Sequence, residues 1–191
     1  QGGMVTRWQR ALEAVQAGIR AIRDLSTSHK PWCAFIGPVG PHDPYVIPAH
    51  YATMYDPADV DLPLSFSDNL LDKPRVYQRQ RRFWAQMAED EYRAAIAHYW
   101  GFCTMQDDLL GMVLEALDAT GQAENTMVIF TSDHGDYAGA HGLFMKGVAA
   151  FDECYHVPFT VRWPRGIAHP GCVVDDLVTL ADFAPTFAEL A

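Results

Sequence analysis

Met127-Val128-Ile129-Phe130-Thr131-Ser132-Asp133-His134-Gly135-Asp136 is the stretch that decides the fold. Its short apolar run, rich in β-branched residues, predicts a buried strand in a parallel or mixed sheet with both faces covered. In such sheets ligands bind beyond the carboxyl ends of the strands, which is where Asp133 and His134 follow. A carboxylate and an imidazole are suitable ligands for a divalent cation. Gly135 permits the backbone bend that would direct both side chains to one ion.

Helical periodicity surrounds this stretch. Apolar residues three or four positions apart predict amphipathic helices over 5–25 and 89–119, the second one ending at Thr120-Gly121. The last ten residues predict another helix, with Pro185 in its first turn.

Further strands are predicted from apolar runs over 32–36, 156–163 and 173–181. Between the first of these and about residue 80 lies a proline-rich stretch, which is more typical of a functional loop than of filler. Helices alternating with strands predict the α/β class, a mixed sheet between helices.

Size and charge exclude several classes of protein. The 191 residues, 49% hydrophobic and 20% charged, suit one globular domain. With 14 Lys and Arg against 24 Asp and Glu the formal charge is −10, which argues against a nucleic-acid partner. A solvated loop or helix start explains the cluster Arg75 to Arg82 better than an anion site does. No apolar run reaches the roughly 20 residues of a membrane span, and four scattered cysteines predict no zinc site.

A second polar cluster follows the predicted strand 32–36 and contains His42. If this strand and 127–131 point the same way in one sheet, His42 and Asp133 share a crevice. Lys146, about a dozen residues beyond His134, can fold back toward the anion that a metal ion binds. A cation, an ammonium and an imidazole converging on one point suit an oxyanion such as sulfate or phosphate. Asp136 and the nearby His141 are expected to stabilise the loop.

Several blocks in this order resemble the sulfatase family of the alkaline-phosphatase-like superfamily, including its choline-sulfatase-like and phosphonate-monoester-hydrolase-like members. The blocks are Pro41-His42-x-Pro44, the helix 99–117 with Asp107-Asp108, the stretch 125–136, His141-Gly142-Leu143-x-x-Lys146, Asp152-Glu153 with Val157-Pro158, Arg162-Trp163-Pro164, and Asp182-x-x-Pro185-Thr186. The resemblance implies an alkaline-phosphatase-like mixed sheet sandwiched between helices, and a sulfuric ester hydrolase acting on a small-molecule sulfate ester.

The resemblance also implies a role for each candidate residue. Asp133 and His134 would ligate a divalent cation, usually Ca²⁺ in sulfatases and Mn²⁺ or Zn²⁺ in some phosphonate hydrolases. Lys146 would bind the sulfuryl or phosphoryl oxygens. His42 would contact the transferred group and help to protonate the leaving oxygen.

One family motif is missing. The nucleophile of the family is a formylglycine made from Cys or Ser in Cys/Ser-x-Pro-x-Arg, and no cysteine or serine here has that context. The early acidic pair of metal ligands is missing as well. We therefore expect residues 1–191 to form the middle-to-late part of a single sulfatase catalytic domain, inactive in isolation. A phosphonate or phosphate ester hydrolase on the same scaffold and a truncated, non-catalytic homologue are the alternatives. Neither a compartment nor an oligomeric state is indicated.

Overall fold

Two long helices form the base of the molecule. The computed structural model describes residues 6–190. Helix α1 (Arg7–Leu25) begins at a capping box in which Thr6 and Gln9 bond each other's backbone N–H groups. Its apolar stripe, including Val15, Ile19 and Ile22, is buried against α4 (Glu89–Ala119). Both predicted helices are confirmed over the described residues, whereas Val5 lies outside them.

Helix α4 ends at Thr120, and Gly121 follows with φ +70°, as its predicted capping role requires. Near its middle, Gly101 lets another segment approach closely, because a Cβ at this position would lie 2.2 Å from the carbonyl oxygen of Tyr51. Tyr51 belongs to α2 (Ala49–Ala52), which crosses α4 at this point.

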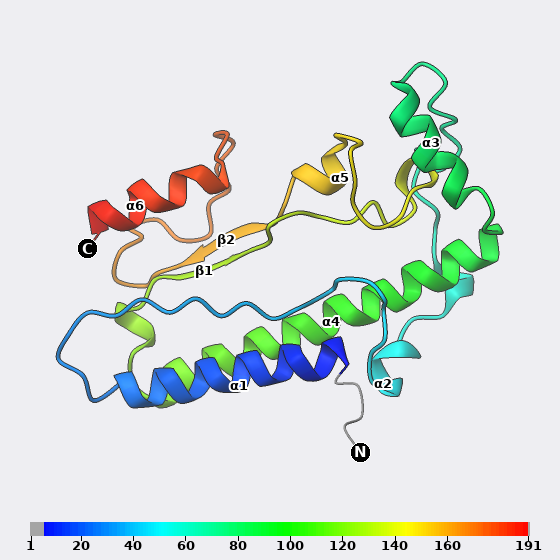
Figure 1. Cartoon of the computed structure of the whole chain (residues 1–191). Coiled ribbons are helices and arrows are strands. Elements are labelled where there is room, and N and C mark those ends of the chain that lie inside the picture. The colour runs from blue at the N-terminus through cyan, green and yellow to red at the C-terminus, as the bar shows by residue number, and fades with distance from the viewer. Residues whose placement is uncertain (1–5, 191) are drawn as a thin grey trace.

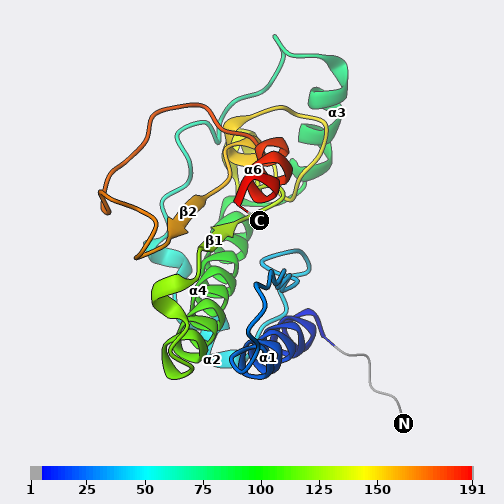
Figure 2. The ribbon, with the colours of Figure 1, turned by 90° about the vertical axis from the view of Figure 1, so that its left-hand side faces the viewer.

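The sheet has two antiparallel strands, β1 (Val128–Thr131) and β2 (Phe159–Arg162), with Ile129 opposite Val161. It lies between α6 (Phe183–Leu190) and the α1–α4 pair, as both views show (Figure 1, Figure 2). Val128 packs against the core between α1 and α4. On the other side the Phe159 and Phe183 ring centroids are 5.6 Å apart. The strands within 127–131 and 156–163 and the C-terminal helix are confirmed.

Two predicted strands are wrong. Residues 32–36 are extended but pair with no strand within 6–190. Trp32 and Ile36 pack on the α1–α4 core, whereas Phe35 is 97% exposed. Residues 173–181 are also unpaired and mostly exposed, and they end in the short helix η4 (Leu180–Asp182). Apolar composition favours burial, but a strand also needs a neighbour for its backbone hydrogen bonds.

The proline-rich stretch is mostly loop, with α2, η1 (Pro57–Asp59) and α3 (Arg75–Trp84) within or after it. The arginine cluster therefore starts a helix, which is its more conservative interpretation. Shorter elements are η2 (Ala123–Asn125), η3 (Ala140–Gly142) and α5 (Asp152–Tyr155). None of the helices within residues 6–190 has both the length and the apolarity that crossing a bilayer requires.

Candidate functional site

The loop after β1 presents the two predicted metal ligands. The Asp133 side chain is 85% exposed and that of His134 is 38% exposed, with His134 Nε2 lying 3.7 Å from Asp133 Oδ2. Gly135 is required here, since a Cβ would lie 1.9 Å from the carbonyl oxygen of Glu153. Its N–H donates to the carbonyl oxygen of Cys154 at 2.9 Å. This close backbone approach at Gly135 fixes the loop against α5.

His134 is oriented by its own loop. Its Nδ1 lies 2.8 Å from the carbonyl oxygen of Gly135, which can only accept a hydrogen bond. The proton is therefore assigned to Nδ1, and Nε2 keeps its lone pair. That lone pair lies on the side of Asp133 Oδ2. The pair thus presents one nitrogen and one carboxylate oxygen to the same point.

His42, Asp43 and Lys146 form the second part of the site. Lys146 Nζ contacts His42 Nε2 and lies 3.7 Å from Asp43 Oδ1. His42 Nδ1 lies 2.8 Å from the carbonyl oxygen and 2.9 Å from the carboxylate of Asp43. Both of these groups are acceptors, so Nδ1 donates and Nε2 accepts from the ammonium group. Asp43 orients the imidazole, and the imidazole and the ammonium group meet at one point.

The two parts are neighbours. The rings of His42 and His134 have centroids 6.5 Å apart, in an edge-on arrangement. Asp133, His134 and Lys146 line one cleft of about 590 Å³, whose opposite wall is formed by residues between Tyr155 and Phe183. The structure therefore brings together all four residues predicted from the sequence, although their roles stay predictions.

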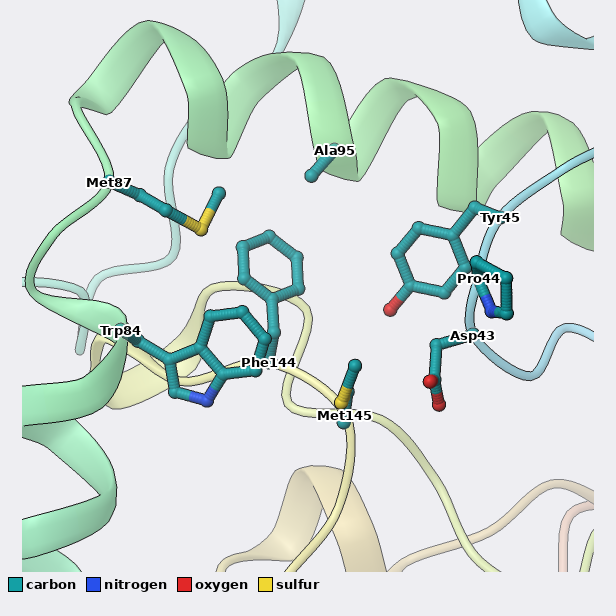
Figure 3. A pocket seen from close by; sticks show the side chains of 8 residues that line it. All are labelled: Asp43, Pro44, Tyr45, Trp84, Met87, Ala95, Phe144 and Met145. Atoms are coloured by element: carbon teal, nitrogen blue, oxygen red, sulfur yellow. The ribbon is translucent and has the colours of Figure 1, made fainter.

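A smaller cavity of about 190 Å³ lies on the other side of Asp43 (Figure 3). Its lining is mostly apolar and comes from the His42 segment, from the region of α3 and α4, and from the residues before Lys146. The lining residues are Asp43, Pro44, Tyr45, Trp84, Met87, Ala95, Phe144 and Met145. This apolar layer separates the charged site from α4.

Metal binding by this arrangement would be incomplete. Asp133 and His134 present two donors, whereas Ca²⁺ takes about six to eight oxygen ligands. Among residues 6–190 no group of three or more His, Cys, Asp and Glu side chains is arranged to hold a metal ion. The two donors fit part of a coordination shell.

Sequence reasoning missed Asp43 as a site residue. It lies inside the Pro41-His42-x-Pro44 block that carried the prediction, at the position treated as variable. Its role depends on the approach of Lys146, which no local pattern reveals. His141 behaves as expected, because it contacts Asp68 at 2.9 Å and stacks on Phe151. Asp108, in one of the family blocks, accepts a hydrogen bond from the Tyr51 hydroxyl on the surface of α4.

Comparison with known proteins gives a consistent result. The sequence model of the sulfatase family matches residues 12–191. The chain is 36% identical over 155 residues to an uncharacterized sulfatase, YidJ, of Escherichia coli K12, covering 79% of this chain and 30% of that protein. It is 31% identical over 175 residues to the multifunctional alkaline phosphatase superfamily protein PehA of Trinickia caryophylli, covering 84% and 34%.

A solved structure shares the fold. The phosphonate monoester hydrolase of Agrobacterium radiobacter superposes with a TM-score of 0.69 at 25% identity, over 85% of this chain and 35% of that one. The α/β, alkaline-phosphatase-like class is therefore confirmed, although the sheet within residues 6–190 has only two strands. The chain spans about a third of the length of these relatives.

Proposed function

Because this chain belongs to the sulfatase family, we propose that it supplies the metal- and anion-binding part of an enzyme that hydrolyses sulfate esters. The observation that carries the proposal is the contact between Lys146 and His42 beside the Asp133–His134 pair. The ammonium group of Lys146 can donate hydrogen bonds to a tetrahedral oxyanion, and the neighbouring imidazole of His42 holds that group in place. We propose that the chain forms the middle-to-late part of a single catalytic domain.

Charge supports a metal ion at Asp133 and His134. The site contains one lysine, Lys146, and two aspartates, Asp43 and Asp133. By itself it would not attract an anion. A divalent cation on Asp133 and His134 would reverse the balance and polarise an ester oxygen.

The same charge balance bears on the substrate. A sulfate ester carries a single negative charge, whereas a phosphate monoester carries up to two, so a weakly positive site favours the former. A phosphonate monoester is also singly charged. It is therefore the second candidate substrate, which is supported by the likeness to the Agrobacterium phosphonate monoester hydrolase. The proposed substrate is a small-molecule ester of one of these two kinds.

The residues of this chain would act on the leaving group. A nucleophile attacks the sulfur atom in line, the bond to the ester oxygen breaks, and its electron pair goes to that oxygen. A proton held between Lys146 Nζ and His42 Nε2 is available to the departing oxygen. Asp43 keeps His42 turned toward Lys146 through Nδ1. The nucleophile would be a formylglycine outside these 191 residues, since the sequence lacks the Cys/Ser-x-Pro-x-Arg motif.

The identity of the metal can be tested on this chain. The family resemblance favours Ca²⁺, whereas the imidazole of His134 favours Mn²⁺ or Zn²⁺, because Ca²⁺ prefers oxygen ligands. We expect calorimetric titration to give measurable binding for at least one of the three ions and loss of that binding in Asp133→Ala. Binding that survives Asp133→Ala and His134→Ala together would contradict the proposed metal ligands.

The activity is tested on a protein that joins this sequence to a segment with the nucleophile motif. With 4-nitrophenyl sulfate we expect Lys146→Ala to lower kcat/KM by about 100-fold or more, the usual cost of removing a preorganised charge-stabilising group. Lys73→Ala is the matched control, because Lys73 pairs with the exposed Asp72 and should leave kcat/KM unchanged.

Parallel assays with an aryl phosphonate separate the two substrate classes. The 191-residue chain alone should turn over neither ester. Turnover by the purified chain would contradict the assignment of the nucleophile to another segment. If the coding sequence before Gln1 lacks the motif, the alternative of a truncated, non-catalytic homologue is favoured.

A further inference from the structure

Asp136 accepts hydrogen bonds from several parts of the chain, although it is itself neither a proposed metal ligand nor a proposed anion-binding residue. Its Oδ2 accepts from the Tyr45 hydroxyl at 2.7 Å. Its Oδ1 accepts from the backbone N–H groups of Ala138 and Met145, each at 2.9 Å. One carboxylate therefore joins the segment of His42, the segment of Asp133 and His134, and the segment of Lys146.

The two backbone donors are strained residues. Ala138 has φ +44° and Met145 has φ +64°, values in the left-handed region that a non-glycine residue adopts at a cost of about 1–2 kcal/mol. Such conformations persist only where the surroundings impose them. The carbonyl oxygen of Met145 also accepts from the N–H of Tyr137 at 2.9 Å. The turn that delivers Lys146 is thus held on one side by Oδ1 of Asp136.

The hydrogen bond from Tyr45 fixes the position of the segment that carries His42. Tyr45 lies three residues after His42, and its ring packs against Tyr99 of α4 with centroids 5.5 Å apart. Figure 3 shows Tyr45 and Asp43 together on one side of the apolar cavity, with Met145 beneath it. The Tyr45 hydroxyl reaches Asp136 from this position. Burial raises the pKa of Asp136, and its three donors offset part of the cost of keeping a carboxylate there.

We infer that Asp136 is a positioning residue, whose carboxylate sets the separation between His42 and Lys146 by tying the segments that carry them to the loop after β1. The inference rests on the proposed function of that pair. Without the hydrogen bond to Asp136, Met145 is free to relax from its left-handed conformation, and the turn that carries Lys146 moves with it. The His42 segment then also loses the hydrogen bond from Tyr45 to Asp136. Asp136 holds the anion-binding geometry and takes no part in the chemistry.

The test uses Tyr45→Phe, Asp136→Asn and the double variant of the 191-residue chain. Tyr51→Phe is the matched control, because it also removes a tyrosine–aspartate hydrogen bond, to Asp108, away from the site. The readouts are the NMR signals of the Lys146 side chain and the affinity for inorganic sulfate. Tyr45→Phe removes only the hydroxyl, whose hydrogen bond is to Asp136, and keeps the ring, so a change at Lys146 in this variant reports on Asp136.

We expect Tyr45→Phe to shift the Lys146 signals and to weaken sulfate binding by about twofold to tenfold, the equivalent of one hydrogen bond. Asp136→Asn should do the same or more, and the double variant should add little to it, as coupled residues do. Tyr51→Phe should change neither readout, whatever its effect on stability.

Unchanged Lys146 signals in Tyr45→Phe, or effects that add fully in the double variant, would overturn the inference. If the unaltered chain binds no sulfate with or without a divalent cation, the proposed anion site fails. The Lys146 signals still decide in that case whether Asp136 positions the turn. The two failures are therefore distinguishable.

Discussion

Replacing Gly101 by alanine should destabilise the chain even though alanine is the better helix former. A Cβ at this position would lie 2.2 Å from the carbonyl oxygen of Tyr51 and 3.3 Å from the side chain of Ile47. The first contact is with backbone, which cannot swing aside as a side chain can. Overpacking of this kind costs about 1–3 kcal/mol. Alanine regains about 1 kcal/mol of helix propensity.

Gly111 provides the control within the same helix. A Cβ there meets nothing within 4 Å, so Gly111→Ala should gain the propensity term alone. That term is common to both variants and cancels in the comparison, which leaves the steric cost of Gly101→Ala. For a chain of this size about 1 kcal/mol corresponds to roughly 2–4 °C in Tm. We expect Gly111→Ala to raise Tm. The Tm of Gly101→Ala should be at least about 2 °C below that of Gly111→Ala.

The assay is thermal and urea unfolding followed by circular dichroism, with the midpoint compared at an unchanged m-value. Equal stabilisation by both substitutions would refute the close approach of α2 to α4.

Three further predictions concern stability. The backbone N–H of Leu70, which donates to Asp68, is the main cause that lowers the pKa of this carboxyl below its ordinary value of 3.8. The stability that Asp68 contributes is therefore present above pH 3.8 and lost as the pH falls through the lowered pKa. Asp68→Asn should accordingly lower the free energy of unfolding at pH 7 by at most about 1 kcal/mol, and by less as the pH falls below 3.8; an equal loss at neutral and acidic pH would exclude the carboxylate as the cause. Gln106 is buried, and neither of its amide atoms has a hydrogen-bond partner within residues 6–190, so Gln106→Met should raise the free energy of unfolding by about 1 kcal/mol. A lower free energy of unfolding in urea would mean that the amide is hydrogen-bonded. Phe35→Ser should change the free energy of unfolding in urea by no more than about 0.5 kcal/mol, because Phe35 is 97% exposed. Ile36→Ala should lower it by about 2 kcal/mol or more; similar losses in both variants would show that the Phe35 side chain is packed.

The helices could be predicted because their partners lie within the chain. The stripe of Val15 and Ile19 reports burial on one side, and that side meets α4 within the same 191 residues. The strand prediction at 32–36 used the same kind of evidence and failed. The side chains of Trp32 and Ile36 pack against the core, but the backbone between them pairs with no strand within residues 6–190. Side-chain patterns report burial, whereas strand pairing depends on a second segment that the pattern does not contain.

The candidate site divides in a similar way. His42, Lys146 and the Asp133–His134 pair could be located by family resemblance, because each lies in a short block with a recognisable order. Asp43 and Tyr45 could not, since Lys146 and Asp136, the partners that connect them to the rest of the site, are about a hundred residues away in sequence. Such contacts arise only when the loops meet.

The loops meet mainly on α4, while the sheet contributes less. Tyr92 on α4 donates from its hydroxyl to the carbonyl oxygen of Gly142, at 2.9 Å, within the segment that leads to Lys146. Tyr99, two turns further along, supports the ring of Tyr45. β1 supplies only the start of the loop with Asp133. Two long helices buried against each other open less readily than a two-stranded sheet, which is marginal when isolated. The Lys146 and Tyr45 side of the site should therefore keep its geometry through local opening of the strands, and hydrogen exchange should protect α4 more strongly than β2.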